Sequence, residues 1–181
     1  MNQKTLSMSQ KALWITETAV MTALLIALQA LTKSGGQYVT GSGVNAVLAV
    51  SALVAGLWSG VVVAALSPFF AFLLGIGPQL LPIVPTIAAG NIVFVLLLRL
   101  IAGEKSEPLW RQGAAWLAAA VGKFAVLYLL VVKLLCSVLP LQQPQIDLFS
   151  VMFSYPQLVT ALVGGALALL VTPVLRKALK R

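Results

Sequence analysis

The stretch IVPTIAAGNIVFVLLLRLI, residues 83–101, decides the fold class. Its only charged side chain is Arg99, which lies close to the C-terminal end of the run. About 20 consecutive apolar residues span the roughly 30 Å hydrocarbon core of a bilayer when they form an α-helix. A membrane barrel would instead show strands that alternate between apolar and polar residues. We therefore predict that this stretch is a transmembrane helix.

Five further apolar runs flank this stretch, separated by short segments rich in glycine, proline or polar residues. Over the 181 residues, 60% are hydrophobic and 9% are charged, which leaves too few polar side chains to cover a soluble globule. The chain is predicted to be an all-α integral membrane protein, a bundle of six transmembrane helices in a single domain, residues 1–181. The predicted helices are residues 14–31, 44–57, 61–74, 83–101, 112–139 and 157–175. The second is the weakest, because a helix of that length reaches only about 21 Å.

The basic side chains predict the orientation of this bundle. With six spans, nine of them fall on one side: Lys4, Lys11, Arg99, Lys105, Arg111, Arg176, Lys177, Lys180 and Arg181. The other side has only Lys33, with Lys133 near a helix end. The positive-inside rule then places both termini in the cytoplasm. Topology explains the net charge of +8 without any nucleic-acid binding.

The residue inventory excludes most enzyme chemistry. The chain has no histidine, a single cysteine, Cys136, and four acidic residues. Metal sites and histidine-based catalysis are therefore not expected. Residues 36–43 read GQYVTGSG and lack the Lys-Ser/Thr pair of a phosphate-binding loop. The chain is predicted not to be an enzyme and to have no cofactor of its own.

Lys123 is the most costly residue in the predicted bundle. In a helix it lies about 18 Å beyond Arg111, near the middle of the membrane. A lysine there costs about 2.5–3.5 kcal/mol on insertion scales. We interpret Lys123 as part of a ligand pocket or adjacent to one, with Asn91 and Tyr128 as candidate neighbours. The alternative is a structural role, in contacts to backbone carbonyls or in a buried polar network.

The predicted outer loops, residues 32–43, 75–85 and 140–156, are rich in glycine and amide side chains and carry one acid, Asp147. Their donors and aromatic side chains suit the capture of a polar solute from outside. Together with Lys33, Lys123 and Lys133 they make the outer half net positive, which favours an anionic or carboxylate-bearing ligand. The alternative is that these loops are simply solvated.

Small side chains recur along the first predicted helix at Ala19, Ala23 and Ala27. Such a stripe lets another helix approach closely. It fits docking of a partner subunit, and it fits internal packing equally well. We interpret a second set of small residues, in the last predicted helix, as internal packing: Ala161, Gly164, Gly165 and Ala168.

In size, spans and motifs the chain resembles the substrate-binding S components of energy-coupling factor (ECF) vitamin transporters. The resemblance covers nearly the whole length and rests on the order and spacing of several motifs. These are the alanine stripe, Val44-Asn45-Ala46 after a glycine-rich loop, Asn91 after Ala-Ala-Gly, Gly122-Lys123-Phe124, and Tyr155-Pro156-Gln157 before Gly164-Gly165.

The resemblance implies several partners. A transmembrane scaffold (T) subunit would dock on Ala19, Ala23 and Ala27, and two cytosolic ATPase subunits would use ATP. The S component would topple in the membrane to release its vitamin inside the cell. Members of this family are typical of the bacterial plasma membrane.

The resemblance also implies an outer pocket made by the three outer loops and the outer halves of the last three helices. Carried onto this chain, the expected substrate-binding residues are Gln37, Tyr38, Asn45, Gln79, Asn91, Lys123, Tyr128 and Gln157, with Lys123 as the charge contact. The positive balance favours an anionic vitamin such as pantothenate, while cobalamin, folate and a pyrimidine precursor stay open. Two other classes also stay open, a stand-alone small-solute carrier or channel and a non-transporting structural membrane subunit.

Overall fold

The computed structural model describes residues 8–103 and 108–179, and every regular element in these ranges is helical. The long helices are α1 (Met8–Thr32), α2 (Gly36–Val50), α3 (Leu57–Leu73), α4 (Ile83–Ala102), α5 (Leu109–Leu127) and α8 (Tyr155–Ala178). α2 continues into a π-helical turn, η2 (Ser51–Ala55), and α5 continues through η3 (Tyr128–Leu135) into α6 (Cys136–Val138). A 3-10 turn, η1 (Lys33–Gly35), joins α1 to α2, and a short helix, α7 (Gln143–Met152), lies between α6 and α8. The predicted all-helical class is confirmed.

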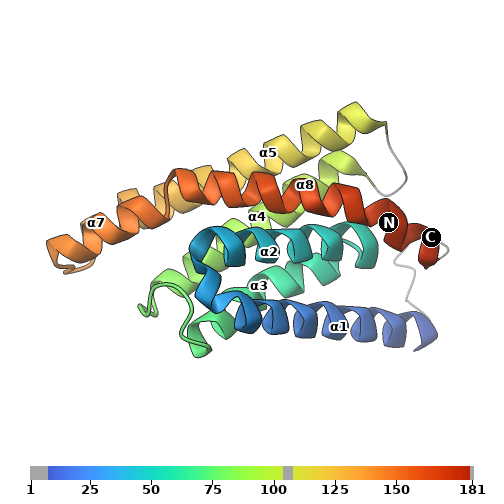
Figure 1. Ribbon diagram of the computed structural model, residues 1–181, viewed down its shortest axis with the longest axis horizontal. Coiled ribbons are helices and arrows are strands. Elements are labelled where there is room, and N and C mark those ends of the chain that lie inside the picture. Colours follow the sequence, from blue (N-terminus) through green and yellow to red (C-terminus); the bar gives the residue numbers. More distant parts are fainter. Residues whose placement is uncertain (1–7, 104–107, 180–181) are drawn as a thin grey trace, which may run out of the picture.

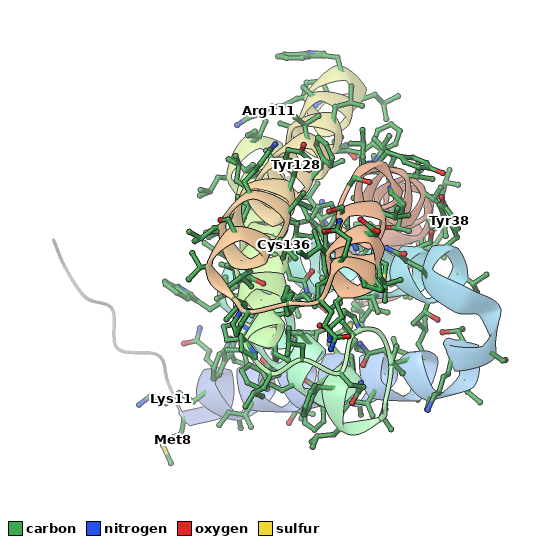
Figure 2. The ribbon with its side chains drawn as sticks, turned by 90° about the vertical axis from the view of Figure 1, so that its left-hand side faces the viewer. Met8, Lys11, Tyr38, Arg111, Tyr128 and Cys136 are labelled. Carbon is green, nitrogen blue, oxygen red and sulfur yellow. The ribbon has the colours of Figure 1, made fainter. Side chains whose placement is uncertain are left out.

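The long helices form a closed ring. In order around it, α1 packs on α3, α3 on α4, α4 on α5, α5 on α8, α8 on α2, and α2 back on α1. Figure 2 looks along the bundle and shows this arrangement, with α1 and α5 on opposite sides. The predicted internal packing of the small residues in α8 is confirmed, since Ala161, Gly164, Gly165 and Ala168 are all buried.

The outer surface is apolar enough for lipid. Within the described ranges, four segments are long and apolar enough to cross a membrane, and α3 is a shorter apolar helix. The four are Met8–Ala55, Ile83–Ala102, Leu109–Val138 and Gln143–Ala178. Helices satisfy their own backbone hydrogen bonds, as a segment inside lipid must. The protein is therefore membrane-embedded, while the count of six crossings stays a prediction.

The first predicted loop, residues 32–43, is largely helical, so the prediction that the second helix begins at residue 44 was wrong. The chain reverses at Gly36, whose φ of 73° suits glycine, and α2 starts there. Gly41 and Gly43 lie inside α2, where they allow close packing. An added Cβ would lie 3.0 Å from Thr160 at position 41 and 2.6 Å from Leu28 at position 43. Together α2 and η2 run from residue 36 to residue 55, so about 30 Å of helix replaces the expected 21 Å.

The prediction that residues 140–156 form a loop was also wrong, because α7 forms within them. Gln142 caps this helix, and its backbone N–H donates to Gln145 Oε1 at 3.1 Å. Pro144 lies in the first turn, where a missing N–H costs nothing. Phe149 is buried against Ile83, Leu127, Val131 and Phe153, which anchors α7 to the bundle. The remaining boundaries differ from prediction mainly by extra turns at helix ends, at residues 8–13, 109–111 and 176–178.

The two ends of the bundle differ in charge. The start of α1 and the end of α8 lie at the same end of the molecule (Figure 1). Five basic residues occupy this end: Lys11 in α1, Arg99 in the last turn of α4, Arg111 in the first turn of α5, and Arg176 and Lys177 in the last turn of α8. Lys4, Lys105, Lys180 and Arg181 lie outside the described residues. The cytoplasmic location of this end stays a prediction.

Candidate functional site

A cavity of about 340 Å³ opens at the opposite end of the bundle, which faces the viewer in Figure 2. This volume lies at the lower end of the roughly 300–1,000 Å³ typical of small-molecule sites. Lys123, Asn45 and Asn91 line its deep part, and Lys33 and Gln37 line its mouth. The other lining residues include Gln29, Thr40, Val44, Ser67, Pro68, Ile87, Met152, Phe153 and Gln157.

The ammonium group of Lys123 is the electrostatic centre of this cavity. Its Nζ donates hydrogen bonds to Asn45 Oδ1 at 2.6 Å and to Asn91 Oδ1 at 2.7 Å, and lies 5.8 Å from the centre of the Phe94 ring. The side chain is 3% exposed. Within residues 8–103 and 108–179, no carboxylate pairs with it. Because an ammonium carries three N–H donors, one remains beyond the two amide oxygens.

Glycines in the neighbouring helices set the positions of these groups. Gly164 has no side chain where α8 meets α2, and an added Cβ would lie 2.6 Å from Asn45 Cβ. Gly122 gives Leu97 room in the same way, so α5 packs closely on α4 next to Lys123. Asn45 Nδ2 donates to Thr160 Oγ1 at 3.4 Å, which turns the amide oxygen toward the lysine. Packing and hydrogen bonding thus fix an amide cradle around one cation.

Amide side chains hold the mouth of the cavity together. Gln37 Nε2 donates to the Met152 carbonyl oxygen at 2.6 Å, and Gln157 Nε2 donates to the same oxygen at 3.1 Å. Lys33 Nζ donates to the Leu74 carbonyl oxygen at 2.8 Å. These bonds tie the α1–α2 turn to the α7–α8 junction and to the end of α3. A second cation therefore lies at the mouth, and among residues 8–103 and 108–179 no acidic side chain lines the cavity.

Five of the eight residues expected at the site line this one cavity: Gln37, Asn45, Asn91, Lys123 and Gln157. They come from α2, α4, α5 and α8, so only the folded bundle brings them together.

The other three, Tyr38, Gln79 and Tyr128, do not line it. Tyr128 lies five residues after Lys123, about 140° away around an α-helix, and its ring packs near Phe124 and Lys133 instead. Tyr38 lies at the edge of the bundle (Figure 2), where its hydroxyl donates to that of Tyr155 at 2.8 Å. Gln79 is exposed in the connection between α3 and α4.

Three polar lining residues were missed by the sequence interpretation: Gln29, Thr40 and Ser67. They are buried, on α1, α2 and α3 respectively. A signal existed for Gln29, because an amide inside the apolar run 14–31 is unusual in a membrane helix. The sequence interpretation of this helix considered only the alanine stripe, which lies on a different face from Gln29.

The alanine stripe lies on the outside of the bundle. Ala19, Ala23 and Ala27 are exposed, and the first two line a shallow groove of about 480 Å³ between α1 and α3. Internal packing does not explain these three residues. Docking of a partner on them stays a prediction.

Comparison with known families identifies one match. The model described as "ECF transporter, substrate-specific component" matches residues 15–176, nearly the whole chain. Comparison with curated proteins and with solved structures found no match.

Proposed function

Because the chain belongs to the family of substrate-specific components of ECF transporters, we propose that it captures a small anionic vitamin or vitamin precursor for import. The family is one of transporter subunits that bind substrate, and it is not an enzyme family. In our proposal the ligand enters the cavity from the end of the bundle opposite the basic residues of α1, α4, α5 and α8. Its anionic group then binds the Lys123 ammonium.

The observation that carries the anionic assignment is that Lys123 pairs with two neutral amides and, among the residues that the structure describes, with no carboxylate. Removing an ammonium from water is expensive, and amide oxygens recover only part of that cost. A ligand carboxylate would add a charge-assisted hydrogen bond, which is about twice as strong as a neutral one. The free energy of binding would therefore come mainly from neutralising a charge that the fold leaves without an opposite charge.

The size of the cavity supports a small ligand. A volume of about 340 Å³ suits a compact acid such as pantothenate. Cobalamin is far too large to be enclosed in it, and folate would extend beyond its mouth. A neutral pyrimidine precursor would fit, but it would leave Lys123 without a negative partner.

We further propose that the energy for import comes from partners. A transmembrane scaffold subunit would contact Ala19, Ala23 and Ala27, and two cytosolic ATPase subunits would hydrolyse ATP, in a bacterial plasma membrane. The exposure of these three alanines beside the α1–α3 groove supports the docking surface. A stand-alone carrier would transport without these partners, so uptake in cells lacking the ATPase subunits distinguishes the two functions.

The test is to purify the detergent-solubilised protein from cells grown in rich medium and to identify retained small molecules by mass spectrometry. Wild type is expected to retain an anionic vitamin, and Lys123→Met is expected to lose it. Lys133→Met is the matched control, because Lys133 is exposed on the same continuous helix and lies outside the cavity. A wild-type protein that retains nothing and binds no vitamin would favour the structural-subunit function instead.

A further inference from the structure

The cavity wall opposite Lys123 is formed by α1 and α3 and carries two buried polar side chains, Gln29 and Ser67. Gln29 is 2% exposed and Ser67 is 1% exposed, and both line the cavity. Because α1 and α5 lie on opposite sides of the helix ring (Figure 2), these side chains and Lys123 stand on facing walls.

This second wall is poorly hydrogen-bonded. Gln29 Nε2 donates to the backbone oxygen and to the hydroxyl of Ser67, both at the long distance of 3.4 Å. Gln29 Oε1 has no hydrogen-bond partner within the part of the chain that the structure describes. Ser67 Oγ accepts this one long bond from Gln29 Nε2 and donates none within the same described residues. A buried acceptor without a partner destabilises the folded protein, so this arrangement is unfavourable unless a ligand supplies a donor.

The two walls therefore differ in what they offer a ligand. On the α5 side, the short bonds of 2.6 and 2.7 Å satisfy the asparagine oxygens and present a positive donor. On the α1–α3 side, the amide oxygen of Gln29 presents an acceptor, the hydroxyl of Ser67 can accept and donate, and neither group is charged. A single ligand that spans the cavity would meet a cation at one end and hydrogen-bond acceptors at the other.

We propose that Gln29 and Ser67 form a second subsite, which accepts a hydrogen bond from a hydroxyl or N–H group of the ligand whose anionic group binds Lys123. This inference rests on the proposed function and narrows its substrate class. The ligand is a small acid that carries an O–H or N–H donor at the end away from its acidic group. Pantothenate and biotin have this chemistry, whereas nicotinate and lipoate are carboxylates without such a donor.

The variants for the test are Gln29→Met, which keeps the length of the side chain, and Ser67→Ala. Thr172→Val is the matched control. Thr172 Oγ1 is also buried and has no partner among the described residues, but it lies next to Arg176, at the other end of the bundle. Each purified full-length protein is titrated with pantothenate, biotin, nicotinate and lipoate. The thermal unfolding midpoint of each protein is measured with no vitamin added.

Wild type is expected to bind a donor-bearing acid and to bind neither nicotinate nor lipoate comparably. Gln29→Met should raise the dissociation constant about 10- to 100-fold, and Ser67→Ala about 10-fold, as expected for loss of one hydrogen bond to a buried group. Thr172→Val should change it less than about twofold. With no vitamin added, Gln29→Met should unfold at the wild-type temperature or above, because the partnerless oxygen is gone. A purely structural link between α1 and α3 would instead lower that temperature.

Two outcomes overturn the subsite and leave the proposed function intact. One is tight binding of nicotinate or lipoate, and the other is an unchanged dissociation constant for the bound acid in Gln29→Met and Ser67→Ala. A wild-type protein that binds none of the four acids and retains no vitamin from cells overturns the proposed function, and the subsite with it. The two failures are thus distinguishable.

Discussion

Two lysines on one continuous helix, Lys123 and Lys133, lie in very different environments. Lys123 is buried between two asparagine oxygens, while Lys133 is exposed and lies 5.5 Å from the centre of the Tyr128 ring. Lys133 is near a helix end, where a long aliphatic stem lets the charge reach water. Lys123 has no such route, so its charge must be satisfied within the cavity. The difference teaches that position in the bundle, and not residue type, separates a binding charge from an interfacial one.

The largest effect should come from removing each charge in turn. Lys123→Met is expected to weaken binding of the anionic ligand by at least about 30-fold, because a buried charge contact worth about 2–5 kcal/mol is lost. Lys133→Met should change the affinity less than about twofold. Isothermal titration with the retained vitamin measures both. Equal losses in the two variants would remove the distinction between the two lysines.

The next test places a carboxylate beside Lys123. Asn91→Asp is nearly isosteric and would place an anion about 2.7 Å from Nζ. Affinity for an anionic ligand should fall about 10- to 100-fold, because the ammonium is already neutralised. The unfolding temperature without ligand should not fall. If Asn91→Asp bound the acid as tightly as wild type, the anionic assignment would be wrong.

A third prediction concerns the packing that holds Asn45 next to Lys123. Gly164→Ala puts a methyl group against α2, 2.6 Å from Asn45 Cβ. Overpacking of this kind should lower the free energy of unfolding by about 1–3 kcal/mol and should weaken binding as Asn45 shifts. Gly113→Ala is the control, because an added Cβ there meets no atom within 4 Å. Thermal unfolding and titration of both variants provide the comparison.

The smallest effect is expected at the mouth. Lys33→Gln removes an exposed cation but leaves Lys123 intact, so it should slow association of an anion by about two- to fivefold and make it less salt-dependent. The dissociation rate should stay close to that of wild type. Stopped-flow association at low and physiological ionic strength measures this. A large change in the dissociation rate would instead mean that Lys33 contacts the bound ligand directly.

Composition and apolar runs were enough to predict the helical membrane class, because lipid leaves only a few backbone structures available. The two wrong segments were loops that the sequence marks with glycine, proline and glutamine. In residues 36–43 the glycines serve close packing against Thr160 and Leu28. In α7 a capping bond and the burial of Phe149 outweigh the loop composition. The close packing and the burial of Phe149 depend on neighbours distant in sequence, whereas the capping bond joins Gln142 and Gln145 and is local.

For the candidate site, the sequence by itself singled out Lys123, since a charge in mid-membrane is costly wherever its helix packs. It could not determine what satisfies that charge, because Asn45 and Asn91 lie 78 and 32 residues away along the chain. Five residues of α-helix already turn Tyr128 about 140° away from Lys123, so the spacing argued against it. The sequence carried a signal for Gln29, an amide inside an apolar run, but it did not show that Gln29 and Ser67 meet in one cavity. The tertiary structure decided these points, because a cavity is enclosed by side chains from many helices and none of those helices specifies it alone.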